Sequence, residues 1–306
     1  MKLLIIRPSA LGDTLMLMPS IAQLKGSTQI VLVGRSPGID LISPHVNRVI
    51  DYEGSGWHRL FLEDLGVDHG LSLPEPDCAV GFLGDPDGIV KENLKTILGK
   101  TSLHFFPPFP PEGANLHAAS YLAQCLKQGG MPLDPDKCLA DADQRALLQR
   151  GHQAIQKKRL VFHPGSGGKS KNHPPEFWLE LIGELTTDLP SPSFSTSIVL
   201  LGPAEEQLLP FFKREVDGGH AEILFAPELE HLQSILSQAP LYVGHDSGIT
   251  HLAAMLGTPT IALFRMRTVR QWRPLGPAVK VIQSEESSPG LIAKILEEMT
   301  PLASNP

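Results

Sequence analysis

The sequence predicts an α/β protein made of two doubly wound parallel sheets. Short apolar runs alternate with segments whose apolar residues follow helical spacing, which is typical of buried parallel strands covered by helices on both faces. This alternation starts at Lys2 and starts again at Arg159. The length of 306 residues also exceeds the usual size of a single domain. We therefore expect two Rossmann-like domains, residues 1–157 and 158–306, that face each other across a cleft.

The elements of each half follow from its apolar runs and its glycine and proline residues. In the first half we expect strands at residues 2–7, 29–34, 48–52 and 79–83, and helices at residues 14–24, 91–98, 117–127 and 142–157. Residues 101–111, rich in phenylalanine and proline, are expected to be extended or looped, because proline disrupts helices. In the second half we expect strands at residues 159–163, 197–201, 241–244 and 260–264, and helices at residues 176–185, 229–238 and 289–299.

The composition restricts the class of protein. Hydrophobic residues make up 42% of the chain and charged residues 19%, which is typical of a folded globular protein. The formal net charge of −7 gives no overall attraction for nucleic acid. The three cysteines are scattered without a Cys-x-x-Cys pair, and no apolar segment is long enough to span a membrane. We expect a cytoplasmic, reduced protein that binds no nucleic acid.

A polar turn follows the predicted strand that ends at Gly244. Asp246, Ser247 and Gly248 lead into a helix of about two turns that stops at Gly257. The first N–H groups of such a helix lack partners and, together with the helix dipole, attract anions. Asp246 can cap the helix or accept hydrogen bonds from hydroxyl groups, which indicates a ligand with both phosphate and sugar. For the turn alone, an ordinary capped helix is the simpler interpretation.

The turn after the first strand contains a second candidate, Asp13. It directly follows Gly12 and is expected at the carboxyl edge of the sheet, where doubly wound sheets bind ligands. A carboxylate in a partly dry cleft can act as a general base that takes a proton from an attacking hydroxyl. A helix N-cap explains the same residue equally well.

A glycine-rich turn follows the strand that ends at His163. Residues 168–170 match the end of the nucleotide-binding P-loop pattern, but His163 stands where that pattern begins with glycine. A P-loop is therefore the weaker interpretation. A loop with Gly165 and Gly167, whose N–H groups lie beside lysines such as Lys171, still fits an anion. The alternative is a flexible loop with solvated lysines.

A basic cluster follows the predicted strand 260–264. Its members are Arg265, Arg267, Arg270 and Arg273. They are expected at the same edge as the anion-binding turn, which favours contact with phosphate or carboxylate over a merely solvated loop. Asp-x-Asp patterns occur three times in the chain, too often to indicate a metal site, and we expect none.

Three segments together resemble the heptosyltransferase family, the inverting ADP-heptose:lipopolysaccharide transferases of glycosyltransferase family 9 with the two-domain GT-B fold. The segments are Leu4–Asp13, His163–Gly167 with Lys171 and Pro174, and Gly244–Pro259, in family order across nearly the whole chain. The resemblance implies that the first half binds the acceptor and the second half binds the nucleotide-sugar. It also implies that the last helix, near residues 289–300, packs back on the first half.

The resemblance also assigns roles to residues. Asp13 corresponds to the catalytic base, Lys171 to a lysine that contacts the donor diphosphate, and Asp246 to a residue that contacts the donor sugar. Glu205 is a looser match to a glutamate that meets the nucleoside. The implied donor-binding residues are Lys171, Glu205, Asp246, Ser247, Gly248, Ile249, His251, Arg265 and Arg267. The glycines of the two turns are Gly12, Gly165 and Gly167.

The implied function is an inverting, metal-independent glycosyltransferase that moves a heptose or related sugar from an ADP-sugar and uses no cofactor. Its implied acceptor is Kdo-lipid A or inner-core lipopolysaccharide, reached from the cytoplasm with at most peripheral contact with the inner membrane. Arg265–Val269 replaces the Gly-Pro-Thr-Asp-Pro that the family usually carries, and His173 replaces a tryptophan. A nucleotide-sugar epimerase, a P-loop kinase and a non-catalytic sugar-nucleotide binding protein remain alternatives.

Overall fold

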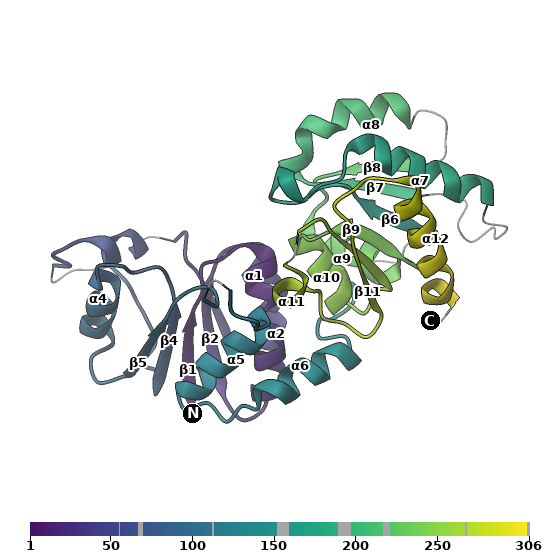
Figure 1. Ribbon diagram of the computed structural model, residues 1–306. Helices are drawn as coiled ribbons and strands as arrows, with labels where there is room; N and C mark the ends of the chain where they lie inside the picture. The colour runs from purple at the N-terminus through teal and green to yellow at the C-terminus, as the bar shows by residue number, and fades with distance from the viewer. Residues whose placement is uncertain are drawn as a thin grey trace. The chain divides into compact units, whose positions relative to one another are not determined.

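The structure is a computed structural model that describes residues 1–54, 56–66, 70–111, 113–151, 159–188, 197–216, 221–266 and 268–304. The chain divides into two compact units, residues 1–141 and 142–306, and each unit contains one parallel sheet (Figure 1). The predicted class, two Rossmann-like parallel-sheet units, is confirmed. The predicted domain boundary, between residues 157 and 158, lies outside the described residues.

The sheet of the first unit has the strand order β3-β2-β1-β4-β5 in the described residues, and all neighbouring strands are parallel. The strands are β1 (Lys2–Ile6), β2 (Gln29–Gly34), β3 (Arg48–Asp51), β4 (Cys78–Phe82) and β5 (Ser102–Phe106). The helices are α1 (Leu11–Leu15), α2 (Met18–Leu24), α3 (Gly38–Ile42), α4 (Ile89–Leu98), α5 (Ala118–Gln128) and α6 (Pro135–Gln144), with 3-10 turns η1 (Ser43–His45) and η2 (Trp57–Phe61). The strand order reverses between β1 and β4, which is the switch point where doubly wound sheets bind ligands.

The central strand β1 illustrates why the sheet forms. Leu3–Ile6 is a continuous apolar run, and all four side chains are fully buried. A strand between two parallel neighbours is covered on both faces, so both sets of alternating side chains must be apolar. Leu4 and Ile6 pack into one cluster with Trp57 of η2 and Leu94 of α4.

The sheet of the second unit has the strand order β11-β10-β9-β6-β7-β8 in the described residues. The strands are β6 (Leu160–His163), β7 (Ser197–Leu201), β8 (Ala221–Phe225), β9 (Tyr242–His245), β10 (Thr260–Phe264) and β11 (Val279–Gln283). The helices are α7 (Pro175–Asp188), α8 (Leu209–Glu215), α9 (Leu229–Gln238), α10 (Gly248–Met255), α11 (Val269–Trp272) and α12 (Pro289–Ser304), with 3-10 turns η3 (Lys169–Lys171) and η5 (Pro203–Leu208). Read from β8, this is the 3-2-1-4-5-6 order of dinucleotide-binding sheets, with its switch point between β6 and β9.

Helices cover both faces of the second sheet. On one face, α7, α8 and α12 share a core with alternate strand residues such as Phe162 and Val243. On the other face lies α10, where the Tyr242 hydroxyl is 3.0 Å from Oγ1 of Thr250. The last helix α12 packs against β10 and α7 of its own unit. Its predicted contact with the first unit stays a prediction.

One predicted helix is misplaced along the chain. α6 ends at Gln144, residues 145–151 are not helical, and residues 152–158 lie outside the described part. The helix begins earlier because Oδ1 of Asp134 accepts hydrogen bonds from the N–H groups of Asp136 and Lys137, with Pro135 in the first turn. Beyond its end, the N–H groups of Leu147 and Leu148 donate to the carbonyl of Met255, so this segment is held by α10 instead of by helical bonds.

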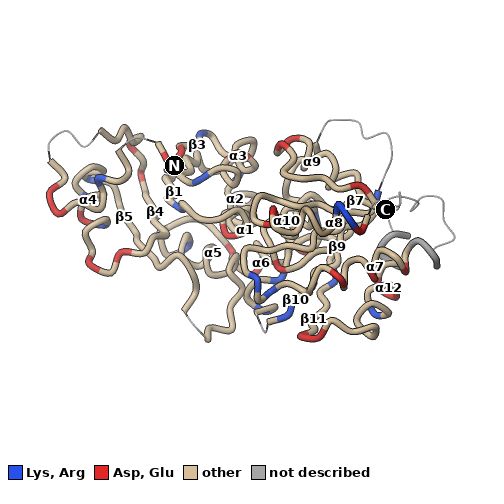
Figure 2. The backbone as a smooth tube through the Cα atoms, turned by 90° about the horizontal axis from the view of Figure 1, so that it is seen from above, with Lys and Arg blue, Asp and Glu red and all other residues tan. Residues whose placement is uncertain are grey.

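The remaining features of the two units are less specific. Lysine and arginine are interspersed with aspartate and glutamate along both units (Figure 2). The three cysteines are free and buried. Among the described helices, none has the length and apolar character that a membrane span requires.

Candidate functional site

Asp13 lies in the first turn of α1, directly beyond the carboxyl end of β1. The N-cap of α1 is Ala10, so the alternative interpretation of Asp13 as the N-cap is wrong. Thr14 Oγ1 holds the turn by hydrogen bonds to the carbonyls of Ser9, at 3.2 Å, and Ala10, at 2.9 Å. Asp13 is half-buried at the switch point of the first sheet, and its role as a base stays a prediction.

Arg7 is a residue that sequence reasoning missed, because it was expected only to end the first strand. Its side chain is 1% exposed, which is rare for arginine. Nε donates to the main-chain carbonyl of Asp13 at 3.1 Å, and Nη1 donates to the carbonyl of Pro108 at 2.7 Å. Burial lowers the pKa of Arg7 to about 10, and the Asp13 carboxylate partly opposes this shift. The available signal was an arginine that directly follows a buried strand.

In the second unit, the exit loops of β6 and β9 meet in an ion pair. Nζ of Lys171, in η3, lies 2.7 Å from Oδ2 of Asp246. These loops are neighbours because β6 and β9 are adjacent strands at the switch point. Nε2 of His251 lies 4.0 Å from the other carboxylate oxygen of Asp246. The structure therefore brings together three of the residues that were expected to bind the donor.

The N-terminus of α10 lies directly beyond Asp246. Its N-cap is Ser247, whose Oγ accepts a hydrogen bond from the N–H of Thr250 at 3.3 Å. Of the two roles open to Asp246, the helix cap does not fit, since Ser247 is the N-cap and the Asp246 carboxylate pairs with Lys171. Within the described residues, the N–H groups of Gly248 and Ile249 donate no hydrogen bond. Two backbone donors and the positive end of the helix dipole thus remain for an anion.

Glu205 lies in η5, after β7, and is 5% exposed. Its Oε2 accepts a hydrogen bond from the N–H of Gly202 at 2.9 Å and lies 3.7 Å from Nε2 of His163. Nδ1 of His163 lies 3.4 Å from Oγ of Ser247, so the imidazole joins η5 to the start of α10. Burial raises the pKa of Glu205, but His163 and the Gly202 N–H outweigh it, and the net shift is downward. Gly165 packs directly on the Glu205 side chain, which leaves no room for a Cβ atom.

His173, which replaces the tryptophan usual in the family, is buried two residues after Lys171. Its N–H donates to Nε2 of His245 at 2.8 Å, and its ring stacks on the His245 ring with centroids 5.4 Å apart. The ring also packs on Phe177 at 4.8 Å, and Nδ1 lies 2.8 Å from Oγ of Ser287. Burial, followed by the charge of Arg265, lowers the pKa of His173 to about 4. The imidazole is therefore neutral at pH 7 and packs as an aromatic ring.

Two arginines of the basic cluster have structural partners. Arg265 donates to the carbonyl of Asn172 at 2.7 Å and to that of Glu285 at 2.9 and 3.2 Å. Arg273 makes a bidentate pair with Asp143 at 2.7 and 2.6 Å. Arg265 thus fixes the loop that follows Lys171, so the interpretation as a merely solvated loop does not fit it. Arg267 lies outside the described residues, and contact of either Arg265 or Arg267 with a ligand stays a prediction.

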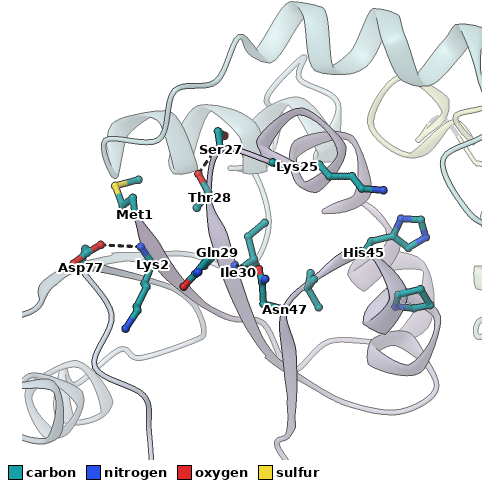
Figure 3. Close-up of a pocket in the computed structure, with 13 residues that line it drawn as sticks. Met1, Lys2, Lys25, Ser27, Thr28, Gln29, Ile30, His45, Asn47 and Asp77 are labelled. Atoms are coloured by element: carbon teal, nitrogen blue, oxygen red, sulfur yellow. Dashed lines mark hydrogen bonds between the residues drawn. The ribbon is translucent and has the colours of Figure 1, made fainter.

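A hollow of about 630 Å³ lies at the opposite edge of the first sheet (Figure 3). It is lined by the amino ends of β1 and β2, including Lys2 and Gln29, and by Lys25, His45 and Asp77. None of the predicted site residues lines it. Within the described residues, no group of three or more His, Cys, Asp or Glu side chains could hold a metal ion.

The family of the chain follows from its sequence. Residues 114–297, more than half of the chain, match the family described as glycosyltransferase family 9 (heptosyltransferase). The chain belongs to glycosyltransferase family 9. No curated protein sequence gives a significant match to this glycosyltransferase.

Solved structures share the fold of the glycosyltransferase. A family 9 glycosyl transferase from Veillonella parvula gives a TM-score of 0.74 at 14% identity, over 100% of this chain and 97% of that one. E. coli heptosyltransferase WaaC with ADP gives a TM-score of 0.69 at 17% identity, over 98% of this chain and 100% of that one. E. coli ADP-heptose lps heptosyltransferase II gives 0.68 at 16% identity, over 99% of each chain. The predicted GT-B fold is confirmed.

Proposed function

We propose that this glycosyltransferase moves a heptose or a related sugar from ADP-heptose to a lipopolysaccharide core-type acceptor, with inversion and without a metal ion. The observation that carries the proposal is the Lys171–Asp246 ion pair beside the open N-terminus of α10. A cation and backbone donors suit a diphosphate, and a carboxylate suits sugar hydroxyls. The structural similarity to the solved structures of WaaC with ADP and of ADP-heptose lps heptosyltransferase II supports ADP-heptose as the proposed donor.

In the proposed reaction, Asp13 takes the proton of an acceptor hydroxyl. The hydroxyl oxygen attacks the anomeric carbon from the face opposite the diphosphate, so the new C–O bond forms as the bond to the diphosphate oxygen breaks. ADP leaves with the bonding electron pair. Lys171 and the N–H groups of Gly248 and Ile249 stabilise its charge, the task that a metal performs in metal-dependent transferases. We propose no cofactor for this step.

The proposed acceptor is Kdo-lipid A or inner-core lipopolysaccharide. Such a glycolipid is anchored in a membrane by its acyl chains, so the proposal includes peripheral contact with the inner membrane. The proposed acceptor hydroxyl must reach Asp13, which belongs to the first unit.

The test is the release of ADP from ADP-heptose with and without Kdo-lipid A, in the presence of EDTA. We expect release that depends on the acceptor, and a turnover in Asp13→Asn that is roughly 10²–10⁴-fold lower. ADP binding should stay nearly unchanged in this variant, and the exposed Asp40→Asn is the matched control. Normal turnover in Asp13→Asn would contradict the base. Complete loss of activity in EDTA would contradict the metal-free mechanism. ADP release at the same rate with and without Kdo-lipid A would contradict the proposed sugar transfer to this acceptor.

A further inference from the structure

We propose that Arg7 is a positioning residue that fixes the turn carrying Asp13 and favours the ionised form of its carboxylate. The inference rests on the proposed function, in which Asp13 is the general base. Arg7 does not contact the reacting atoms in this proposal. It acts through Asp13 alone.

The burial of Arg7 is the first observation that calls for a role. A guanidinium that leaves water loses much of its hydration energy and is retained only where hydrogen bonds and an opposite charge compensate. Arg7 is 1% exposed, and its guanidinium carbon lies over two aromatic rings, 5.6 Å from the centroid of Phe82 and 5.9 Å from that of Phe109. Burying a leucine at this position would require no desolvation of a charge. The presence of a guanidinium instead indicates a role for its charge and its N–H donors.

The hydrogen bonds of Arg7 explain how α1 is held. This helix has five residues and an N-cap without a side-chain hydrogen bond, so it is too short to be stable by itself. Nε of Arg7 binds the Asp13 carbonyl, and Nη1 binds the Pro108 carbonyl in the loop after β5. The guanidinium therefore ties the first turn of α1 to a neighbouring segment of the same unit. Fixing a base within a fraction of an ångström is what general-base catalysis requires.

The charges around Arg7 point to Asp13 as its electrostatic partner. The Arg7 charge interacts with Asp13, Tyr121 and Cys125. Burial raises the pKa of Tyr121 and raises that of Cys125 to about 11, so both are neutral at pH 7. The helix α3, which packs on α1, contributes Asp40, which is exposed to solvent. Because the attraction is reciprocal, the Arg7 charge favours the Asp13 carboxylate, the form that a base needs.

The first test is a titration that needs no substrate. Carbon-13 NMR of aspartate carboxyl groups in the full-length protein follows Asp13, whose signal is identified by its absence in Asp13→Asn. We expect the Asp13 titration midpoint to rise in Arg7→Met, which removes the charge, and to stay near the wild-type value in Arg7→Lys, which keeps it. An unchanged midpoint in Arg7→Met would overturn the inference.

The second test separates positioning from stability by steady-state kinetics with ADP-heptose and Kdo-lipid A. We expect Arg7→Met to lower kcat by on the order of tenfold or more and to move the acid limb of the pH profile upward, with little change in the KM for donor. A loss by the same factor at every pH would indicate a merely structural role. If Arg7→Met does not fold, Arg7→Gln, which also removes the charge, decides: an acid limb that moves upward supports the inference, and an acid limb at the wild-type position overturns it.

The two proposals fail separately. Full turnover in Asp13→Asn would overturn the general base, whatever the titration shows. An inactive Asp13→Asn together with an unmoved Asp13 midpoint in Arg7→Met would overturn the role of Arg7 alone.

Discussion

At the scale of the residue, buried histidines dominate the switch point of the second sheet. His163, His173, His245 and His251 are each at most 3% exposed. The pKa of His173 is lowered to about 4, and that of His245 is lowered well below its ordinary value by burial and the neighbouring imidazoles. Nε2 of His245 accepts the His173 N–H, which assigns the proton of the neutral His245 ring to Nδ1. Because Nε2 of His245 accepts this hydrogen bond, the contact with His173 requires a neutral His245 ring.

The neutral rings predict a loss of stability in acid. Because His173 has a lower pKa in the folded state than in the unfolded state, the unfolded chain binds more protons between about pH 6.5 and pH 4. Stability therefore falls as the pH decreases through this window, by about 3 kcal/mol at most for this group. We expect His173→Phe, which keeps the stacking, to flatten the dependence of the unfolding free energy on pH, measured by urea denaturation. His58 is exposed, so His58→Asn should leave the pH dependence of the unfolding free energy unchanged. A pH dependence in His173→Phe as steep as that of the wild type would refute the argument.

Individual site residues differ in how well their sequence predicts them. Lys171 and Asp246 lie in two loops whose strands are adjacent only after folding, so their spacing in the sequence does not predict the 2.7 Å contact, and only the resemblance to a family assigned both to donor binding. A cap at Asp246 stayed open in the sequence because aspartate and serine are both good N-caps, and only the backbone decides which one begins the helix. Arg7 was missed since burial of a single arginine depends on Phe82 and Phe109, which are distant in sequence.

At the scale of the element, glycine in the β6 exit turn controls the position of Glu205. A Cβ on Gly165 would overlap the Glu205 side chain, whereas a Cβ on Gly167 would meet nothing within 4 Å. We expect Gly165→Ala to displace Glu205 and to weaken adenosine binding, measured by calorimetry, by about tenfold. Gly167→Ala in the same turn is the matched control and should bind normally. Equal adenosine binding by both variants would show that the position of Glu205 does not matter for nucleoside recognition.

Elements were predictable where their apolar pattern is uninterrupted. Ser197–Leu201 and Leu229–Gln238 have the predicted bounds, because a continuous apolar run and a clear helical face leave little ambiguity. The edge strands β8 and β11 were missed, since Glu222 and Lys280 interrupt their apolar runs, whereas the edge strand β3 carries its charged residues at its two ends. The helix expected at 142–157 was displaced because its start depends on the Asp134 cap and its end on bonds to Met255.

At the scale of the whole molecule, the residues proposed for the two substrates are divided between the units. Asp13 and Arg7 belong to residues 1–141, and Lys171, Glu205 and Asp246 belong to residues 142–306. Each group lies at the carboxyl edge of its own sheet, and Asp13, Lys171 and Asp246 follow strands that flank a switch point. Duplication of one sheet topology thus provides two ligand edges in one chain, one suited to a base and one suited to an anion.

This division predicts that ADP alone stabilises the glycosyltransferase. A ligand that binds only the folded state raises the unfolding free energy by about 2.7 kcal/mol at a hundred times its Kd, so ADP should raise Tm, with EDTA present or absent. Lys171→Ala should weaken ADP about tenfold, near the low end for a charge-assisted hydrogen bond, because Lys171 is 37% exposed and partly screened. Adenosine should bind this variant as before, and Lys169→Ala, an exposed lysine of the same turn, is the matched control. Equal losses for ADP and adenosine in calorimetry would contradict a diphosphate contact at Lys171, and an ADP shift that disappears in EDTA would contradict a metal-free anion site.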